Sequence, residues 1–204
     1  MTIKLADIAE ISLGTILTRV NALEHDDALE VDTISMQEVS YYCGKTDYKG
    51  EALFSKIKKD KINSCEFTKK DDIVLGLTSK CAMVIDCCRE NKLVASNFLR
   101  IRIHDTNLLN PMYLCWLFNE SDEIKKCFKS STQGNGAVTL MKAQDIRKLE
   151  INVIPILEQE KIAKFYQLYL DKYKVDRRLT ELKLFMSKYI TNNYYKGAKK
   201  NENK

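Results

Sequence analysis

The segment ILEQEKIAKFYQLYLDKYKVDRRLTELKLFMSKY, residues 156–189, contains neither Gly nor Pro, the two residues that most strongly interrupt helices. Its apolar residues recur every three or four positions, with one slip of register between Tyr173 and Val175. This spacing predicts one helix on the order of 50 Å long, whose apolar stripe packs either back on its own domain or against a partner helix. The expected helix–helix seam contains Ile162, Tyr166, Tyr169, Tyr173, Val175, Leu179, Leu182, Met186 and Tyr189.

The balance of positive and negative charge changes close to the start of this predicted helix. Residues 161–204 carry twelve Lys or Arg and four Asp or Glu, whereas residues 1–160 carry 21 Lys or Arg and 24 Asp or Glu. The net charge of the whole chain is +5. Two regions of opposite sign indicate two roles, and the separate charge of the helix favours a partner helix. We therefore expect a domain over 1–157, a long dimerisation and spacer helix over 158–192 and a flexible basic tail over 193–204.

The amino-terminal region shows the pattern of a mixed α/β domain. Residues 73–77 and 81–86 are apolar runs of strand length, and FLRIRIH, residues 98–104, alternates strictly. The alternation predicts a strand with a buried aliphatic face and a solvent-facing basic face formed by Arg100 and Arg102.

The second half of this region has the pattern of two helices, a loop and a last strand. Residues 110–128 form one predicted helix, with Pro111 in its first turn. Residues 130–136 form a polar, glycine-bearing loop, and 142–148 and 150–154 form a short helix and a last strand. The fold class is α/β of the α+β type: a mixed, β-rich domain followed by one long carboxyl-terminal helix.

Composition excludes several classes of protein. No apolar run approaches the roughly 20 residues of a membrane span, and the amino terminus lacks a signal-peptide core, so we expect a cytoplasmic protein without a membrane partner. The seven cysteines form no C-x-x-C pair, and His25 and His104 are not spaced with them as zinc ligands. We expect free thiols and no metal site.

Three patterns that could suggest catalysis have simpler interpretations. Glu90-Asn91-Lys92, downstream of Asp71 and Asp72, has the E-x-K form of metal-dependent nucleases, but polar residues are ordinary in a hairpin turn. Residues 110–113, NPMY, resemble the N-P-P-Y of adenine methyltransferases without the second proline, and a helix cap explains them better. Residues 134–136, GNG, lack the G-K-[ST] of a phosphate loop. We expect no catalytic residue.

Four segments of the chain together resemble the specificity (S) subunit of type I restriction-modification enzymes. KLADIAEISLG (4–14) is similar to the opening of its target-recognition domain, and KKDDIVLGLTSKCAMVIDCC (69–88) to a strand pair of that domain. ASNFLRIRIHDTNLLNPMYLCWLFNE (95–120) resembles its strand followed by a helix. The most specific segment is LMKAQDIRKLEINVIPILEQEKIAKFYQLYLDKYKVDRRL (140–179). The family's domain–helix boundary positions are Pro155, Glu158, Gln159, Ile162 and Ala163.

The resemblance implies a non-catalytic, sequence-specific DNA-binding subunit. A complete S subunit has two recognition domains and two long helices, so this chain resembles a half-length form or, as the alternative, a fragment of a complete S subunit. The implied partners are double-stranded DNA, a modification (M) methyltransferase subunit, a restriction (R) subunit, and a second copy or another half S subunit. The chain itself would need no cofactor, because the partners bind S-adenosylmethionine, ATP and Mg²⁺. Two identical halves predict a bipartite, palindromic target.

The family's DNA contacts are variable, so only residue chemistry indicates them here. Lys, Arg and Ser contact phosphates, whereas Gln, Asn and Arg recognise base edges. The alternative is an interaction or regulatory protein that binds methyltransferase or S-subunit surfaces through its helix without recognising DNA. The candidate DNA-binding residues are Arg19, Lys45, Lys49, Thr78, Ser79, Lys80, Arg100, Arg102, Ser131, Gln133 and Asn135.

Overall fold

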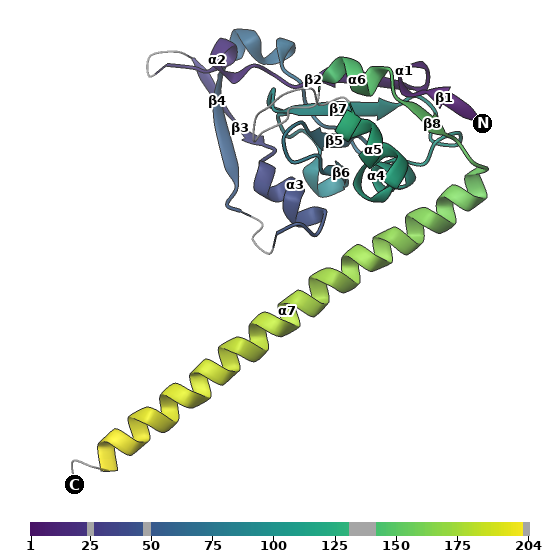
Figure 1. The fold of residues 1–204 in the computed structure, drawn as a ribbon. Coiled ribbons are helices and arrows are strands. Elements are labelled where there is room, and N and C mark those ends of the chain that lie inside the picture. Colours follow the sequence, from purple (N-terminus) through teal and green to yellow (C-terminus); the bar gives the residue numbers. More distant parts are fainter. Residues whose placement is uncertain (24–26, 47–49, 131–141, 202–204) are drawn as a thin grey trace. The chain divides into compact units, whose positions relative to one another are not determined.

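The computed structural model describes residues 1–23, 27–46, 50–130 and 142–201 (Figure 1). The chain divides into two compact units, Met1–Gln167 and Leu168–Lys204. The first holds all the strands of the described part, and the second is helical. The expected α/β class with a long carboxyl-terminal helix is confirmed.

A four-stranded antiparallel sheet forms the centre of the first unit. Its order is β2-β7-β5-β6, and every neighbouring pair is antiparallel. Strand β7 alternates aliphatic with polar residues, and its aliphatic Leu99 and Ile101 are both fully buried. The strands are β2 (Ala9–Leu13), β5 (Ile73–Gly76), β6 (Ala82–Val84) and β7 (Phe98–Ile103).

Two smaller sheets join segments that are distant in sequence. Strand β1 (Thr2–Lys4) pairs with β8 (Glu150–Asn152), which ties the amino terminus to the residues before the last helix. Strand β3 (Ala28–Thr33) pairs with β4 (Leu53–Lys58). Each of these two small sheets therefore joins segments whose pairing could not be read from their spacing in the sequence.

Short helices cover the central sheet. Helix α3 contacts β5 and β6, and α4 contacts β6 (Figure 1). Ser35 caps α3 by accepting the Glu38 backbone amide at 3.0 Å. The helices of the first unit are α1 (Leu5–Ile8), α2 (Leu17–Val20), α3 (Met36–Tyr42), η1 (Lys59–Ser64), η2 (Cys87–Arg89), α4 (Pro111–Glu120), α5 (Asp122–Ser130) and α6 (Ala143–Arg147).

The predicted single helix over 110–128 is two helices. Asn110 caps α4 by accepting the backbone amides of Met112 and Tyr113 at 2.9 and 3.1 Å, and Pro111 occupies its first position as expected. Ser121 is extended and ends α4. The break lets α5 turn away from α4, while Phe118 and Phe128 still stack with ring centroids 6.2 Å apart. The sequence pattern predicted helix over this range but not the break at Ser121.

The prediction of a solvent-facing basic strand face is wrong. Arg100 of β7 is only 4% exposed, and it pairs with Glu66 at 2.8 Å and Glu10 at 2.9 Å. Arg102 makes two 2.7 Å hydrogen bonds to the buried carboxylate of Asp72. Acidic residues from neighbouring segments therefore cover the face that alternation assigned to water, since buried cations require such partners.

The long helix is α7, Ile156–Asn201. It begins two residues before the predicted 158 and continues through most of the expected flexible tail over 193–204. Within the first unit, Gln159 is fully buried and connects α7 to the domain: its amide donates to the carbonyls of Leu108 and Ile154, and its oxygen accepts the Asn110 amide. None of the described helices is long and apolar enough to span a membrane.

Candidate nucleic-acid interface

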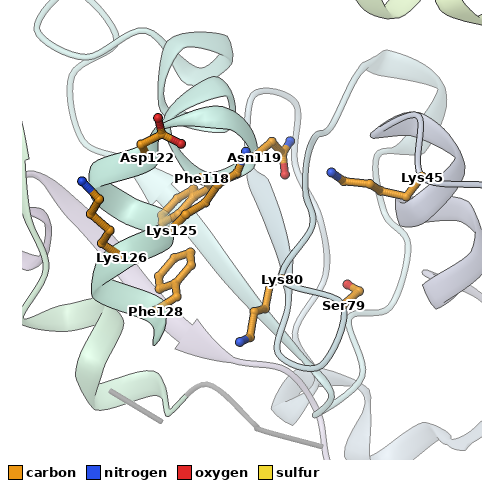
Figure 2. A pocket seen from close by; sticks show the side chains of 9 residues that line it. All are labelled: Lys45, Ser79, Lys80, Phe118, Asn119, Asp122, Lys125, Lys126 and Phe128. Carbon is orange, nitrogen blue, oxygen red and sulfur yellow. The ribbon is translucent and has the colours of Figure 1, made fainter. Parts of the chain in front are cut away.

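A cavity of about 320 Å³ in the first unit has a predominantly basic rim (Figure 2). We call it the lysine pocket. It lies among the β5–β6 turn, the residues after α3, and helices α4 and α5. Its polar and charged rim comprises Lys45, Ser79, Lys80, Asp122, Lys125 and Lys126, and Phe118, Asn119 and Phe128 complete the lining.

The β5–β6 turn presents Ser79 and Lys80 to this pocket. The Lys80 backbone has a φ of 55° and its amide donates to the Gly76 carbonyl at 2.9 Å, which closes a tight turn. The Ser79 hydroxyl accepts the Cys81 amide at 3.3 Å. A Cβ on Gly76 would lie 2.2 Å from the Ser79 hydroxyl oxygen, so a larger residue at position 76 would force the Ser79 side chain to move.

The other lysines reach the same space from separate elements. Lys45 follows α3, where its backbone amide donates to the Ser40 carbonyl at 2.8 Å. In Figure 2, Lys45 and the α5 residues Lys125 and Lys126 lie on opposite sides of the pocket, with Lys80 on the turn between them. Tertiary structure therefore brings four lysines from three chain segments into the lining of one pocket.

The buried side chain of Asn119 fixes the floor of the lysine pocket. Its oxygen accepts the Ala82 amide and its nitrogen donates to the Ala82 carbonyl, both at 2.8 Å. Asn119 thus pairs with the edge strand β6 as a neighbouring strand would. The same nitrogen donates to the Tyr166 hydroxyl of α7 at 3.0 Å.

The pocket is electrostatically positive. Asp122 is the one acid among the described residues of its lining, and the Glu120 carboxylate lies 3.3 Å from the Lys125 amine. A hydrogen bond with Cys43 holds the pKa of the Cys81 thiol beneath the floor below its usual value, and the charge of Lys45 lowers it further. Such a site attracts anions, and phosphate oxygens are the anions for which clustered lysines and a serine hydroxyl are suited.

The structure separates the candidate DNA-binding residues into groups. Lys45, Ser79 and Lys80 meet at the lysine pocket, and Thr78 is exposed on the same turn. Arg19, on α2, lines a different cavity. Arg100 and Arg102 are engaged in the ion pairs described above. Lys49, Ser131, Gln133 and Asn135 lie outside the described residues.

Sequence reasoning missed Lys125 and Lys126. They lie on the polar side of the amphipathic helix α5, whose apolar residues Ile124 and Phe128 are buried. That amphipathic pattern was a usable signal for exposed lysines. Their convergence with Lys45 and Lys80 was not visible, because it depends on the break between α4 and α5 at Ser121.

The predicted seam residues have different environments. Tyr166 is 4% exposed and bonded to Asn119 within the first unit, so its assignment to a helix–helix seam is wrong. Ile162 and Tyr173 are partly buried, and Tyr173 stacks with Tyr169 at 6.3 Å. The remaining seam residues are exposed apolar side chains: Tyr169, Val175, Leu179, Leu182, Met186 and Tyr189.

Two of the three motifs that could suggest catalysis have structural roles, and the third, residues 134–136, lies outside the described residues. Lys92 pairs with the buried Glu38 at 3.3 Å and with Asp32 at 3.2 Å, Asp72 pairs with Arg102, and Asn110 caps a helix. All seven cysteines are free. Among the described residues, no three His, Cys, Asp or Glu side chains gather as metal ligands would.

Comparison with known proteins gives matches in structure alone. No family model and no curated protein matches the sequence. The fold matches the HsdS subunit from Thermoanaerobacter tengcongensis with a TM-score of 0.61 and 13% identity, over 93% of this chain and 46% of that one. It matches the type I restriction-modification S subunit from M. genitalium with a TM-score of 0.52 and 14% identity, over 89% and 42% of the two chains.

A third match is to a chain from a structure on complex assembly and conformational transition of the type I R-M system. The TM-score is 0.57 at 12% identity, over 91% of this chain and 43% of that one. This chain thus spans less than half the length of each of these neighbours. It has the fold of the corresponding part of the S subunits of type I restriction-modification systems, an α/β domain followed by a long helix.

Proposed function

We propose that this chain is a non-catalytic, sequence-specific DNA-binding subunit of a type I restriction-modification system. The observation that carries the proposal is the convergence of Lys45, Lys80, Lys125 and Lys126 on one pocket of a domain with the S-subunit fold. Amines contributed by three segments form a site for backbone phosphates, which position a protein on DNA. Base recognition would come from polar residues near this pocket, such as Thr78 on the exposed turn.

The proposal assigns the chemistry to partner subunits. An M subunit would bind S-adenosylmethionine and methylate adenine, and an R subunit would bind ATP and Mg²⁺ and cleave the DNA. The chain would direct both to the target and would itself need no cofactor. Such a complex would act in the cytoplasm.

The exposed apolar residues of α7 favour pairing through this helix. Val175, Leu179, Leu182, Met186 and Tyr189 follow heptad spacing and are 44% to 66% exposed. Pairing of two copies would bury them and arrange two identical recognition domains about a two-fold axis. The target would then be bipartite and palindromic, with two inverted half-sites around a spacer of unspecified bases.

DNA binding by lysine-pocket variants tests the proposal. We would titrate a fluorescent pool of random duplexes with the wild type and with a Lys45→Ala, Lys80→Ala, Lys126→Ala triple variant, from 50 to about 300 mM salt. The matched control replaces three exposed lysines outside the pocket, Lys4, Lys70 and Lys148. The pocket variant should bind about tenfold or more weakly at 100 mM salt, and its salt slope should fall by about 0.9 for each phosphate that it no longer binds.

Two outcomes would count against the proposal. Equal weakening of binding in the pocket and control variants would remove the lysine pocket from the interface. A wild-type chain that binds no DNA even at 50 mM salt would favour a regulatory protein that occupies methyltransferase or S-subunit surfaces. Methylome sequencing of a host with and without the gene then identifies the target, and an asymmetric target would contradict pairing of two identical copies.

A further inference from the structure

A second cavity, of about 430 Å³, lies near the carboxyl end of β2. We call it the Arg19 cavity, and its basic residues are Arg19 of α2 and Lys61 of η1. Both side chains are exposed, and no carboxylate among the described residues pairs with Arg19. The ammonium of Lys61 lies 3.4 Å from Asp60, but this pair is on the surface, where such contacts contribute little.

Among the described residues that line the Arg19 cavity, the one acid is Glu66, and it is engaged in an ion pair. Glu66 accepts the Arg100 guanidinium at 2.8 Å and the Ser12 hydroxyl at 3.2 Å. Its negative charge is therefore partly offset by the buried Arg100, which it shares with Glu10, and Glu66 forms no ion pair with Arg19 or Lys61. A guanidinium beside an ammonium is suited to phosphate, which the planar fork of arginine can bind with two hydrogen bonds.

Strand register places the Arg19 cavity and the lysine pocket at the same end of the central sheet. Leu13 of β2 and Leu75 of β5 both pair with Leu99 of β7, so the two strands run in the same direction and end in the same row. The chain leaves this row toward Arg19 from β2 and toward Lys80 from β5. The outer strands β2 and β6 are three strand spacings apart, roughly 14 Å at about 4.8 Å each.

This strand spacing is of the same order as the grooves of duplex DNA. The grooves are about 6 Å and 12 Å wide, and each is bordered by the phosphates of the two strands. We propose that the Arg19 cavity binds a backbone phosphate across one groove from the phosphates held at the lysine pocket. The end of the sheet would then span that groove, with the exposed turn at Thr78 facing the base edges. This inference rests on the proposed DNA-binding function and adds a second phosphate site to it.

An Arg19→Ala, Lys61→Ala double variant tests the second phosphate site. Its salt slope should fall by about 0.9 to 1.8 relative to the wild type, for one or two phosphates that are no longer bound. Binding at 100 mM salt should weaken by about tenfold, while the Lys4→Ala, Lys70→Ala control stays unchanged. Both replaced side chains are exposed, so thermal unfolding should be the same as that of the wild type.

Ethylation interference on the duplex locates the bound phosphates independently. In each variant, ethylation of the phosphates that have lost their protein contact should no longer weaken binding. The phosphates identified with the Arg19 and Lys61 variant should lie across a groove, on the opposite DNA strand, from those identified with the lysine-pocket variant. If the double variant bound DNA with wild-type affinity and salt slope while the lysine-pocket variant bound more weakly, the second phosphate site would be overturned and the proposed function would stand. The same set of phosphates for both variants would also overturn the second phosphate site. Absence of DNA binding by the wild type would instead overturn the proposed function.

Discussion

The Asn119 side chain donates a hydrogen bond to the Tyr166 hydroxyl at 3.0 Å, and this bond joins α4 to the beginning of α7. Through its other hydrogen bonds the same amide pairs with both backbone groups of Ala82 on β6. Strand β6 follows directly on the turn that carries Lys80. One buried amide therefore connects the long helix, the edge of the sheet and the lysine pocket.

Replacement of Asn119 by Ala should destabilise the domain by about 1 to 3 kcal/mol, because the buried amide of Ala82 loses its acceptor while the carbonyl keeps only the weak thiol donors of Cys43 and Cys115. Tyr166→Phe should cost only about 1 kcal/mol, since it removes one hydroxyl while the pairing with β6 remains. Urea unfolding of both variants measures these differences. Equal stability of Asn119→Ala and the wild type would show that the amide does not hold the sheet edge.

Arg102→Met should destabilise the protein by about 3 to 5 kcal/mol, because it leaves the carboxylate of Asp72, 1% exposed, without its cation. Adding Asp72→Asn should recover part of the loss, since Asn is uncharged and still accepts the Lys69 backbone amide. Urea unfolding compares the single and double variants. A stable Arg102→Met variant with a reduced DNA salt slope would instead assign Arg102 to phosphate binding.

Alkaline pH should destabilise the domain through Cys115. Burial raises the pKa of this thiol to about 12, whereas the unfolded chain ionises near the ordinary value of about 8.5. A raised pKa stabilises the fold below the unfolded value, and that stability is lost as pH rises toward the folded value. Between pH 9 and 10.5 the loss should be on the order of 1 to 2 kcal/mol.

Urea unfolding at several pH values checks this expectation. Cys115→Ala removes the titrating group, so its free energy of unfolding should fall less steeply with pH than that of the wild type. Identical slopes for the two proteins would show that Cys115 does not contribute to the alkaline loss.

Leu182→Glu should separate paired chains, because it places a charge in the proposed helix seam. The dimer dissociation constant should rise at least about a hundredfold. Thr180→Glu is the matched control, since Thr180 lies on the same helix outside the heptad positions. Sedimentation of the three proteins measures the effect, and a wild type that is monomeric at micromolar concentration would contradict pairing of two copies.

Local sequence determined the type and place of most elements. Alternation predicted β7, and the two apolar runs over 73–77 and 81–86 contain the paired strands β5 and β6. Absence of Gly and Pro over 156–189 predicted α7, and Asn110-Pro111 predicted the start of α4. These features are readable because propensity, capping and periodicity act between residues close in sequence.

Tertiary structure decided which charged residues remain available to a ligand. Arg100 and Arg102 carry the sequence pattern of an exposed basic face, yet Glu66, Glu10 and Asp72 cover them. Tyr166 follows the helical stripe of the seam residues, yet its hydroxyl belongs to the core of the first unit. Lys45, Lys80 and Lys126 come together from three segments that no local pattern relates. Long-range pairing of charges and strands is fixed only on folding, because the cost of burying a charge depends on partners from elsewhere in the chain.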